Sequence, residues 1–312
     1  MDLRQLKYFV QIVDSGSLAK ASRQLYIAQP ALSQQLSKLE AEIGKPLLIR
    51  SSKGVTPTEN GAALLHHARF MLRQLEQALS VARQEPGTVH GMVSVGLAAT
   101  TICALGVPFV RRIRERYPGI VLNVVEGMSG HLRQMMQTGQ LDLVILFARD
   151  AIPELVADPL VDEELFVLLP THSKLIAQRR VKVSIAEAAQ LPLILPTSMH
   201  GLRRRIVAEF EQRNLSATVV AEIDSLSLLL ACVDEGIGVT IKPMAAALQA
   251  GQLRKGWRCL AISDANMKRQ NFLYSVVPER LSPAAAVVRT ELKETVKNLV
   301  QSGAWKGVEL LY

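Results

Sequence analysis

The sequence predicts an α/β protein with a helical N-terminal part and a larger C-terminal part in which strands and helices alternate. Apolar residues recur at steps of three and four within residues 3–43, which is typical of amphipathic helices. From Gly91 onward, short apolar runs alternate with helical patterns, as in βαβ units. The 312 residues suffice for two or three domains, and 49% hydrophobic with 21% charged residues excludes wholesale disorder.

Several function classes are disfavoured by what the sequence lacks. No window holds 18 uninterrupted apolar residues, and residues 1–13 are too polar for a signal peptide, so a cytoplasmic protein without a membrane partner is expected. The three widely spaced cysteines predict neither disulfides nor a metal site. GxSxG, GxxxxGK[ST] and HExxH are absent, so catalytic residues and cofactors are not expected and an α/β enzyme is the less favoured alternative. The net charge of +8 favours an anionic partner.

Three short helices are expected within residues 3–43. Gly16 ends the first connection, and Ser17 is the expected N-cap of the second helix. Pro30 suits the first position of the third helix because it needs no amide donor there, and Gly44 ends that helix. The expected inward faces hold Leu3, Leu6, Val10 and Val13, then Leu18, Ala21 and Leu25, then Leu32, Leu36, Leu39 and Ile43.

The third helix leaves short polar side chains outside its apolar stripe, among them Gln29, Ser33 and Gln34. Glutamine pairs with the edge of adenine, and serine bonds to bases or phosphates. Two short helices joined by a tight turn match the helix-turn-helix geometry, in which the second helix enters the major groove. A solvated polar face on a small helical domain is the alternative.

Residues 47–58 predict a β-hairpin with a basic tip, or wing. The apolar run LLIR at 47–50 is followed by SSKG at 51–54 and VTPT at 55–58. Arg50 and Lys53 are placed to meet the DNA backbone or the minor groove, and solvated surface charges are the alternative.

The ordered motifs of the first sixty residues resemble the N-terminal domain of LysR-type transcriptional regulators, and the chain length also agrees. The motifs are LKYF at 6–9, GSL at 16–18, AQPALS at 28–33, LSKLE at 36–40, LLIR at 47–50 and TPTENG at 56–61. The resemblance implies a winged helix-turn-helix domain over 1–58. It also implies a DNA-binding set of Gln29, Pro30, Ala31, Ser33, Gln34, Arg50, Lys53, Thr56 and Thr58.

The role of two residues in that DNA-binding set, Gln34 and Thr58, is left open by the sequence. Many relatives carry arginine where this chain has Gln34, so a charged contact is not expected there. Thr58 is as well placed to cap the following helix as to face a phosphate.

Residues 59–85 are expected to form a long linker helix with an apolar stripe, followed by a hinge at 86–90. Self-association through the stripe is favoured by the resemblance, and packing onto its own small domain is the alternative. The residues expected at a dimer contact are Leu64, Ala68, Met71, Leu75 and Leu79.

The part from residue 91 to 312 predicts strands that alternate with helices and hence a parallel sheet. Strands are expected at 92–97, 120–126, 141–147, 164–169, 191–195, 219–223, 239–242 and 271–277. Helices are expected at 103–117, 130–138, 201–213, 225–235 and 282–300. Gly236 and Gly238 predict a tight helix-to-strand turn in place of a dinucleotide site.

The resemblance implies that 91–312 is a periplasmic-binding-protein-like effector domain. Subdomain I is expected at 91–160 and 268–300, and subdomain II at 161–267, with a ligand cleft between them. Helix N-termini attract anions, and three polar helix starts are expected to bind the effector or to act only as caps. They supply Thr100, Thr101, Ser129, Ser198 and His200.

The function that the resemblance implies is transcription regulation in a bacterial cytoplasm. A homodimer or homotetramer is expected to bind dyad-symmetric operator DNA, to act with RNA polymerase and to control promoter activity. A small-molecule effector is expected, and a regulator of the same class without a small co-inducer is the alternative.

Overall fold

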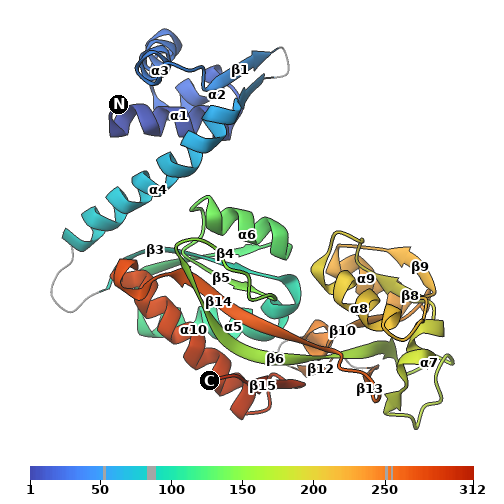
Figure 1. Ribbon diagram of the computed structural model, residues 1–312. Helices are drawn as coiled ribbons and strands as arrows, with labels where there is room; N and C mark the ends of the chain where they lie inside the picture. Colours follow the sequence, from blue (N-terminus) through green and yellow to red (C-terminus); the bar gives the residue numbers. More distant parts are fainter. Residues whose placement is uncertain (52–53, 83–88, 250–251, 254–255) are drawn as a thin grey trace. The chain divides into compact units, whose positions relative to one another are not determined.

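The computed structural model describes residues 1–51, 54–82, 89–249, 252–253 and 256–312 (Figure 1). The chain divides into two compact units. Unit 1 comprises Met1–Gly91 with Gln134–Leu141, and unit 2 comprises Met92–Arg133 with Asp142–Tyr312. Among the described residues, every helix is too short or too polar to cross a membrane.

Unit 1 carries three short helices, a two-stranded hairpin and one longer helix. They are α1 (Leu3–Ser15), α2 (Leu18–Leu25), α3 (Gln29–Ile43), β1 (Leu48–Ser51), β2 (Gly54–Pro57) and α4 (Glu59–Ala82). The predicted helices and hairpin are confirmed. Ser17 caps α2 by accepting a hydrogen bond from the amide of Lys20, and Gly44 ends α3 in the left-handed conformation.

One apolar core joins α1, α2 and α3, and it corrects part of the predicted inward face. In α1 the buried side chains are Leu6, Phe9 and Ile12, whereas Leu3 is exposed. Ile43, also expected inside, is exposed at the end of α3. Two overlapping stripes of α1 fit the helical period, and the position of the neighbouring helices selects the stripe that contains Phe9.

Hydrogen bonds from backbone amides in and beside the hairpin hold it to the helices. The Glu40 carboxylate accepts hydrogen bonds from the amides of Leu47 and Leu48 at 2.8 and 3.3 Å. The amide of Val55 donates to the carbonyl of Gly16 at 2.9 Å. The hairpin therefore has a fixed base on the helix pair.

Helix α4 divides its predicted apolar stripe between two roles. Ala68 is fully buried in the core of unit 1, and Leu64 and Met71 pack against that core. Leu75 and Leu79 are 37% and 42% exposed. The alternative of packing onto the small domain is thus correct for the first half of the stripe. Residues 83–85 of the predicted linker helix lie outside the described residues.

Unit 2 is a mixed α/β structure. Two of its elements reach into unit 1, namely β3 with its first residue and α6 with its last residues. Its strands are β3 (Gly91–Leu97), β4 (Ile120–Glu126), β5 (Leu143–Leu146), β6 (Leu155–Pro170), β7 (Lys182–Val183), β8 (Leu193–Leu195), β9 (Val219–Glu222), β10 (Thr240–Pro243), β11 (Leu248–Gln249), β12 (Gln252–Leu253), β13 (Trp257–Ile262), β14 (Lys268–Val276) and β15 (Val308–Leu310). Its helices are α5 (Ala99–Arg116), α6 (Ser129–Gln137), α7 (Ile185–Gln190), α8 (Gly201–Glu211), α9 (Leu226–Asp234) and α10 (Pro283–Gln301), with 3₁₀ turns at Met244–Ala247 and Pro278–Arg280.

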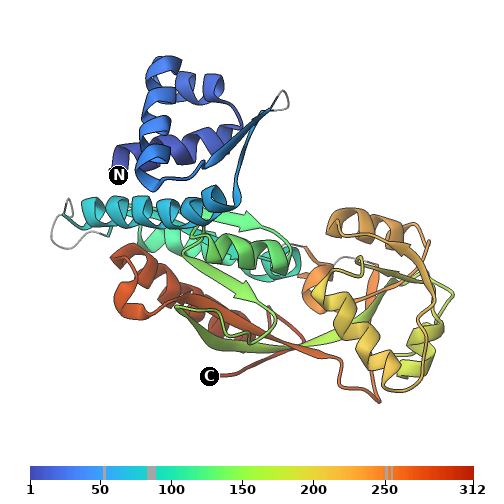
Figure 2. The same cartoon turned by 45° about the horizontal axis from the view of Figure 1, so that its top comes forward.

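The large sheet has the order β4-β3-β5-β14-β6-β13-β7, and β10 and β15 also pair with β6. Strands β6 and β14 run side by side from the end with α5, α6 and α10 towards the end with α7, α8 and α9 (Figure 1 and Figure 2). The predicted parallel sheet is correct only in part. Strands β3 and β5 are parallel, whereas β14, β10, β13 and β15 pair antiparallel with β6.

Strand β6 is far longer than the predicted strand at 164–169. Its residues 155–164 pair with β14, and residues 165–170 pair with β10 and β13. The change of partner falls at Glu164 and Leu165, a few residues after the expected subdomain boundary at 160. Strand β15 lies beyond the range expected for subdomain I and pairs with β6 residues 161–163.

Smaller corrections concern single positions. The apolar pattern of residues 103–117 predicts Leu105, Phe109, Val110 and Ile113 on the inward face of α5, and of these Val110 is exposed while the other three are buried. The tight turn predicted at Gly236 is confirmed, because that residue is left-handed with φ +74 and its amide bonds to the Val233 carbonyl.

Replacing Gly61 by alanine is expected to destabilise unit 1. A Cβ at Gly61 would overlap the carbonyl oxygen of Leu47, so the hairpin and α4 must move apart. We expect a loss of about 2–4 kcal/mol, measured by urea unfolding followed by circular dichroism. Gly130→Ala is the control, because no atom lies within 4 Å of its added Cβ. Equal stability of the two variants would contradict the close approach.

Candidate functional site

The outer face of α3 is polar and accessible. Gln29, Ala31 and Gln34 are exposed and Ser33 is half-buried, while Leu32 on the opposite face is fully buried. The N-cap residue of α3 is an alanine and makes no side-chain cap. Pro30 has no amide donor, so the amides of Gln29 and Ala31 are the ones available to an anion in the first turn, and the exposed glutamines are available to base edges.

The hairpin adds a second polar surface to unit 1. Arg50 and Thr56 are exposed on β1 and β2, where Arg50 lies opposite Val55. Lys53 lies outside the described residues. The hydroxyl of Thr58 accepts from the amide of Gly61 at 3.0 Å and donates to the carbonyl of Pro46 at 2.8 Å. Thr58 thus has the capping role that the sequence left as its alternative.

Tyr26 stands out between α2 and α3, and sequence reasoning did not select it. Its backbone is left-handed with φ 55, and its side chain is 96% exposed. A left-handed backbone is costly for a bulky residue, and packing against this chain recovers little of that cost. It lies in the turn between α2 and α3, three residues before the exposed Gln29.

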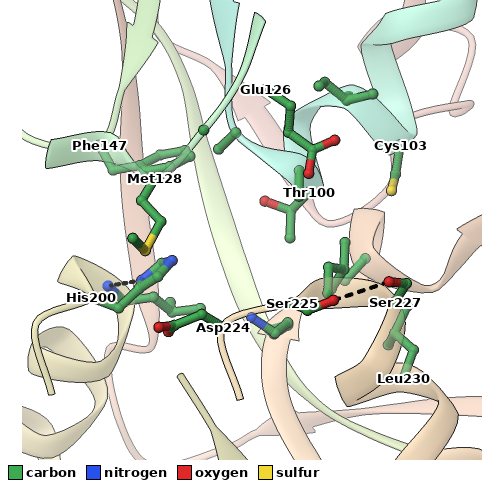
Figure 3. A pocket seen from close by; sticks show the side chains of 18 of the residues that line it. Thr100, Cys103, Glu126, Met128, Phe147, His200, Asp224, Ser225, Ser227 and Leu230 are labelled. Carbon is green, nitrogen blue, oxygen red and sulfur yellow. Dashed lines mark hydrogen bonds between the residues drawn. The ribbon is translucent and has the colours of Figure 1, made fainter. Parts of the chain in front are cut away.

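A cavity of about 750 Å³ lies within unit 2. The first turns of α5, α8 and α9 all contribute to its lining (Figure 3). Thr100 and Glu126 lie on one side of it, and His200, Asp224 and Ser225 lie on the other (Figure 3). Its further lining includes Lys242, Arg269, Ile102, Met128, Phe147, Leu202 and Leu230.

The five predicted effector residues do not come together in one place. Thr100 and His200 line the large cavity. Thr100 lies in the first turn of α5, because that helix begins at Ala99 and not at the expected residue 103. Thr101 is fully buried and does not line the cavity. Ser129 lines a second cavity of about 480 Å³, and Ser198 lines neither of the two.

A buried ion pair closes one wall of the large cavity. The guanidinium of Arg269 pairs with the Glu163 carboxylate at 2.7 Å and donates to the hydroxyl of Thr100 at 2.8 Å. It also lies 3.8 Å from the centre of the Phe147 ring. Glu163 accepts a further hydrogen bond from the indole of Trp305. Arg269 is therefore held in place by a counter-ion and a hydrogen bond.

Burial and neighbouring positive charges lower the pKa values of the other two basic groups of the cavity, Lys242 and His200. Burial, reinforced by the charge of Arg269 and opposed by Asp224, lowers the pKa of Lys242 to about 8. Burial, then the charges of Lys242 and Arg269, lowers the pKa of His200 to about 4, so its ring is neutral at pH 7. The neutral ring caps α8, where its Nδ1 accepts from the amide of Leu202.

Sequence reasoning missed Lys242, Arg269, Glu126 and Asp224. For Lys242 a signal existed, because it is a lone lysine at the end of the apolar run 239–242. The described residues hold no group of three or more His, Cys, Asp and Glu side chains that is able to bind a metal ion.

Comparison with known proteins identifies the family to which this chain belongs. Residues 3–62 match the family model of the bacterial regulatory helix-turn-helix protein, lysR family, and residues 86–297 match the LysR substrate binding domain. The chain belongs to the LysR family of bacterial transcriptional regulators.

Individual relatives agree with this family. The chain is 37% identical to the nitrogen assimilation regulatory protein nac of Klebsiella aerogenes, over 99% of both chains. This confirms a nearer resemblance predicted from IAQPALSQQ at 27–35, LIRSSKGVTPTE at 48–59 and GLA at 96–98. Among solved structures, a full-length OxyR variant of Pseudomonas aeruginosa has a TM-score of 0.75 at 21% identity and covers 95% of both chains. Full-length CbnR complexed with its target DNA has a TM-score of 0.68 at 19% identity, covering 95% of this chain and 100% of that one.

Replacing Glu163 by glutamine is expected to destabilise the chain strongly, because the buried Arg269 loses its counter-charge. We expect a loss of about 3–5 kcal/mol in urea unfolding. The control is Glu309→Gln, which removes an exposed carboxylate paired with Lys268 and is expected to cost below about 1 kcal/mol. Similar losses in both variants would show that the buried pair has no special weight.

Proposed function

We propose that this LysR-family regulator binds dyad-symmetric operator DNA as a homo-oligomer and controls promoter activity in the bacterial cytoplasm, with RNA polymerase as a partner. The observation that carries the proposal is the exposed polar face of α3 beside a hairpin with a fixed base. The cavity of unit 2 is proposed as the site of a small effector. The resemblance to nac favours a second candidate, a regulator of the same class that acts without a small co-inducer.

The proposed domains follow the predicted boundaries. They are a winged helix-turn-helix at 1–58, a linker helix at 59–85, a hinge at 86–90 and an effector domain at 91–312. Within the effector domain, subdomain I takes 91–160 and 268–300, and subdomain II takes 161–267. The pairing of β6 supports two small changes, a crossing point near Glu164 and the inclusion of β15 in subdomain I.

The proposed DNA contacts divide by their chemistry. Exposed Gln29 and Gln34 suit base edges, whereas Arg50 suits the DNA backbone. We add Tyr26, whose exposed hydroxyl suits a phosphate next to the start of α3. Thr58 is a weaker candidate, since its hydroxyl already bonds within the chain. The remaining proposed contacts are Pro30, Ala31, Ser33, Lys53 and Thr56.

The proposed dimer contact is the second half of α4. Leu64, Ala68 and Met71 pack within unit 1, so Leu75 and Leu79 are the apolar groups of the predicted stripe that remain for a partner. A two-fold dimer is suited to inverted half-sites about one DNA turn, roughly 34 Å, apart.

Replacing Gln29 by alanine is expected to weaken operator binding by about 1–3 kcal/mol while leaving binding to random duplex nearly unchanged, because a base contact is read only in the true site. DNase footprinting on the DNA beside the protein's own gene locates the operator, and fluorescence anisotropy on both duplexes gives the affinities.

Gln301→Ala, an exposed glutamine at the end of α10, is the matched control and should leave both affinities unchanged. An equal loss on operator and random DNA for Gln29→Ala would refute base reading by this residue.

Replacing Leu75 and Leu79 together by aspartate is expected to shift the protein from oligomer to monomer at micromolar concentration in sedimentation velocity, because a charge is costly at an apolar contact. Thermal unfolding should be little affected, since both residues are exposed. Leu175→Asp, at another exposed leucine, is the control. An unchanged sedimentation coefficient for the double variant would place the contact elsewhere.

A further inference from the structure

Lys242 is a buried lysine without a counter-ion in the wall of the large cavity. It stands on β10, its side chain is 5% exposed, and among the described residues it forms no ion pair or hydrogen bond. A buried ammonium group is costly unless a negative charge or several acceptors lie against it. The fold therefore retains a charge that this chain does not compensate.

The charged neighbours do not remove this excess. Arg269 adds a second positive charge, and the Glu163 carboxylate is already engaged by it. Asp224 accepts from both the amide and the hydroxyl of Thr197, and it makes no ion pair with Lys242. His200 is neutral, as its low pKa shows.

Two helix N-termini reinforce the positive potential at this place. The first turn of α5, with Ala99 and Thr100, lines the cavity, and its N-cap Ala98 makes no side-chain cap. The first turn of α9, with Leu226 and Ser227, lines the same cavity, and there the N-cap Ser225 takes only the amide of Leu228. Free amides and helix dipoles at such ends attract anions.

We propose that the cavity takes a small organic ligand with one anionic group, a carboxylate or a phosphonate-like group, that contacts the ammonium of Lys242. The inference rests on the proposed function, in which this cavity is the effector site. Lys242 and the amide-rich ends of α5 and α9 hold the anion. Apolar side chains such as Ile102, Phe147 and Leu230 pack against the body of the ligand.

The ligand carries one such group and not several. The carboxylates of Glu126 and Asp224 also line the cavity, and they repel a second anion. Glu126 is exposed and forms no ion pair within the described residues. A polyphosphate therefore does not suit this cavity.

The test uses three probes that share a propyl tail: butyrate, propylphosphonate and butyramide. Thermal unfolding of the full-length protein is followed at pH 7 and constant ionic strength set with sodium chloride. At about ten times its Kd, an anionic probe is expected to raise the Tm by about 3 °C. Neutral butyramide should give no rise. A response to butyrate alone identifies a carboxylate ligand, and a response to propylphosphonate alone identifies a phosphate-like one.

Lys242→Met removes the proposed anchor and is expected to weaken anion binding at least tenfold. Without a probe, this variant should be at least as stable as the natural chain, because an unpaired buried charge is gone. Lys174→Met, at an exposed lysine of a loop, is the control and should keep the full response. The same response in Lys242→Met as in the natural chain overturns the proposal.

Measuring butyrate binding at different pH values needs no substitution at Lys242. It therefore tests the proposal even if Lys242→Met does not fold. The charged or titratable groups that face Lys242 across the cavity are Arg269, Asp224, His200 and Glu126. The pKa of His200 is lowered to about 4, far below the range from pH 7 to 9.5. Cys103 also lines the cavity and is replaced by serine for this measurement. Because Lys242 loses its proton above about pH 8, butyrate binding should weaken at least tenfold at pH 9.5. Undiminished binding overturns the proposal.

A DNA-binding measurement separates failure of the ligand proposal from failure of the proposed function. Lys242→Met should still protect the DNA beside the protein's own gene. If protection persists but neither anion raises the Tm above the level with butyramide, the ligand inference fails alone. If the natural chain protects no DNA, the proposed function fails first.

Discussion

The register of strand β6 is the constraint on which unit 2 depends. Its side chains alternate, so that Leu165, Val167 and Leu169 enter one apolar core while Phe166 and Leu168 enter another. A slip by one residue would exchange these two sets. The same strand carries Glu163, which fixes Arg269 in the cavity wall. Core, sheet and cavity are thus tied to one alignment of β6 with β14, β10 and β13.

The sequence was a good guide to unit 1, because its information is local. Helix period, the cap at Ser17 and the terminator at Gly44 each act within a few residues, and all are present in the structure. The errors, at Leu3 and Ile43, concern which stripe of a helix is covered. That choice depends on neighbouring helices, which the period of one segment does not contain.

The residues that line the cavity could not be predicted in this way, because they come together through long-range strand pairing. Glu163, Lys242 and Arg269 are far apart in the sequence, and antiparallel pairing of β6 with β10 and β14 brings their strands together. No local pattern carries that pairing, and alternation of strands and helices suggested a parallel sheet, which is correct only in part. Thr100 and Thr101 are adjacent at one helix start, yet Thr100 lines the cavity and Thr101 is fully buried without lining it.

The division of α3 into two faces has an evolutionary consequence. Leu32, Leu36 and Leu39 hold the helix in the core, whereas Gln29 and Gln34 take no part in it. Substitutions on the outer face are therefore nearly free of a folding penalty. Under the proposed function, a descendant of this gene can drift towards a new set of target promoters by point mutation, without passing through unstable intermediates. Duplicated copies can diverge in the same way while the rest of the chain is preserved.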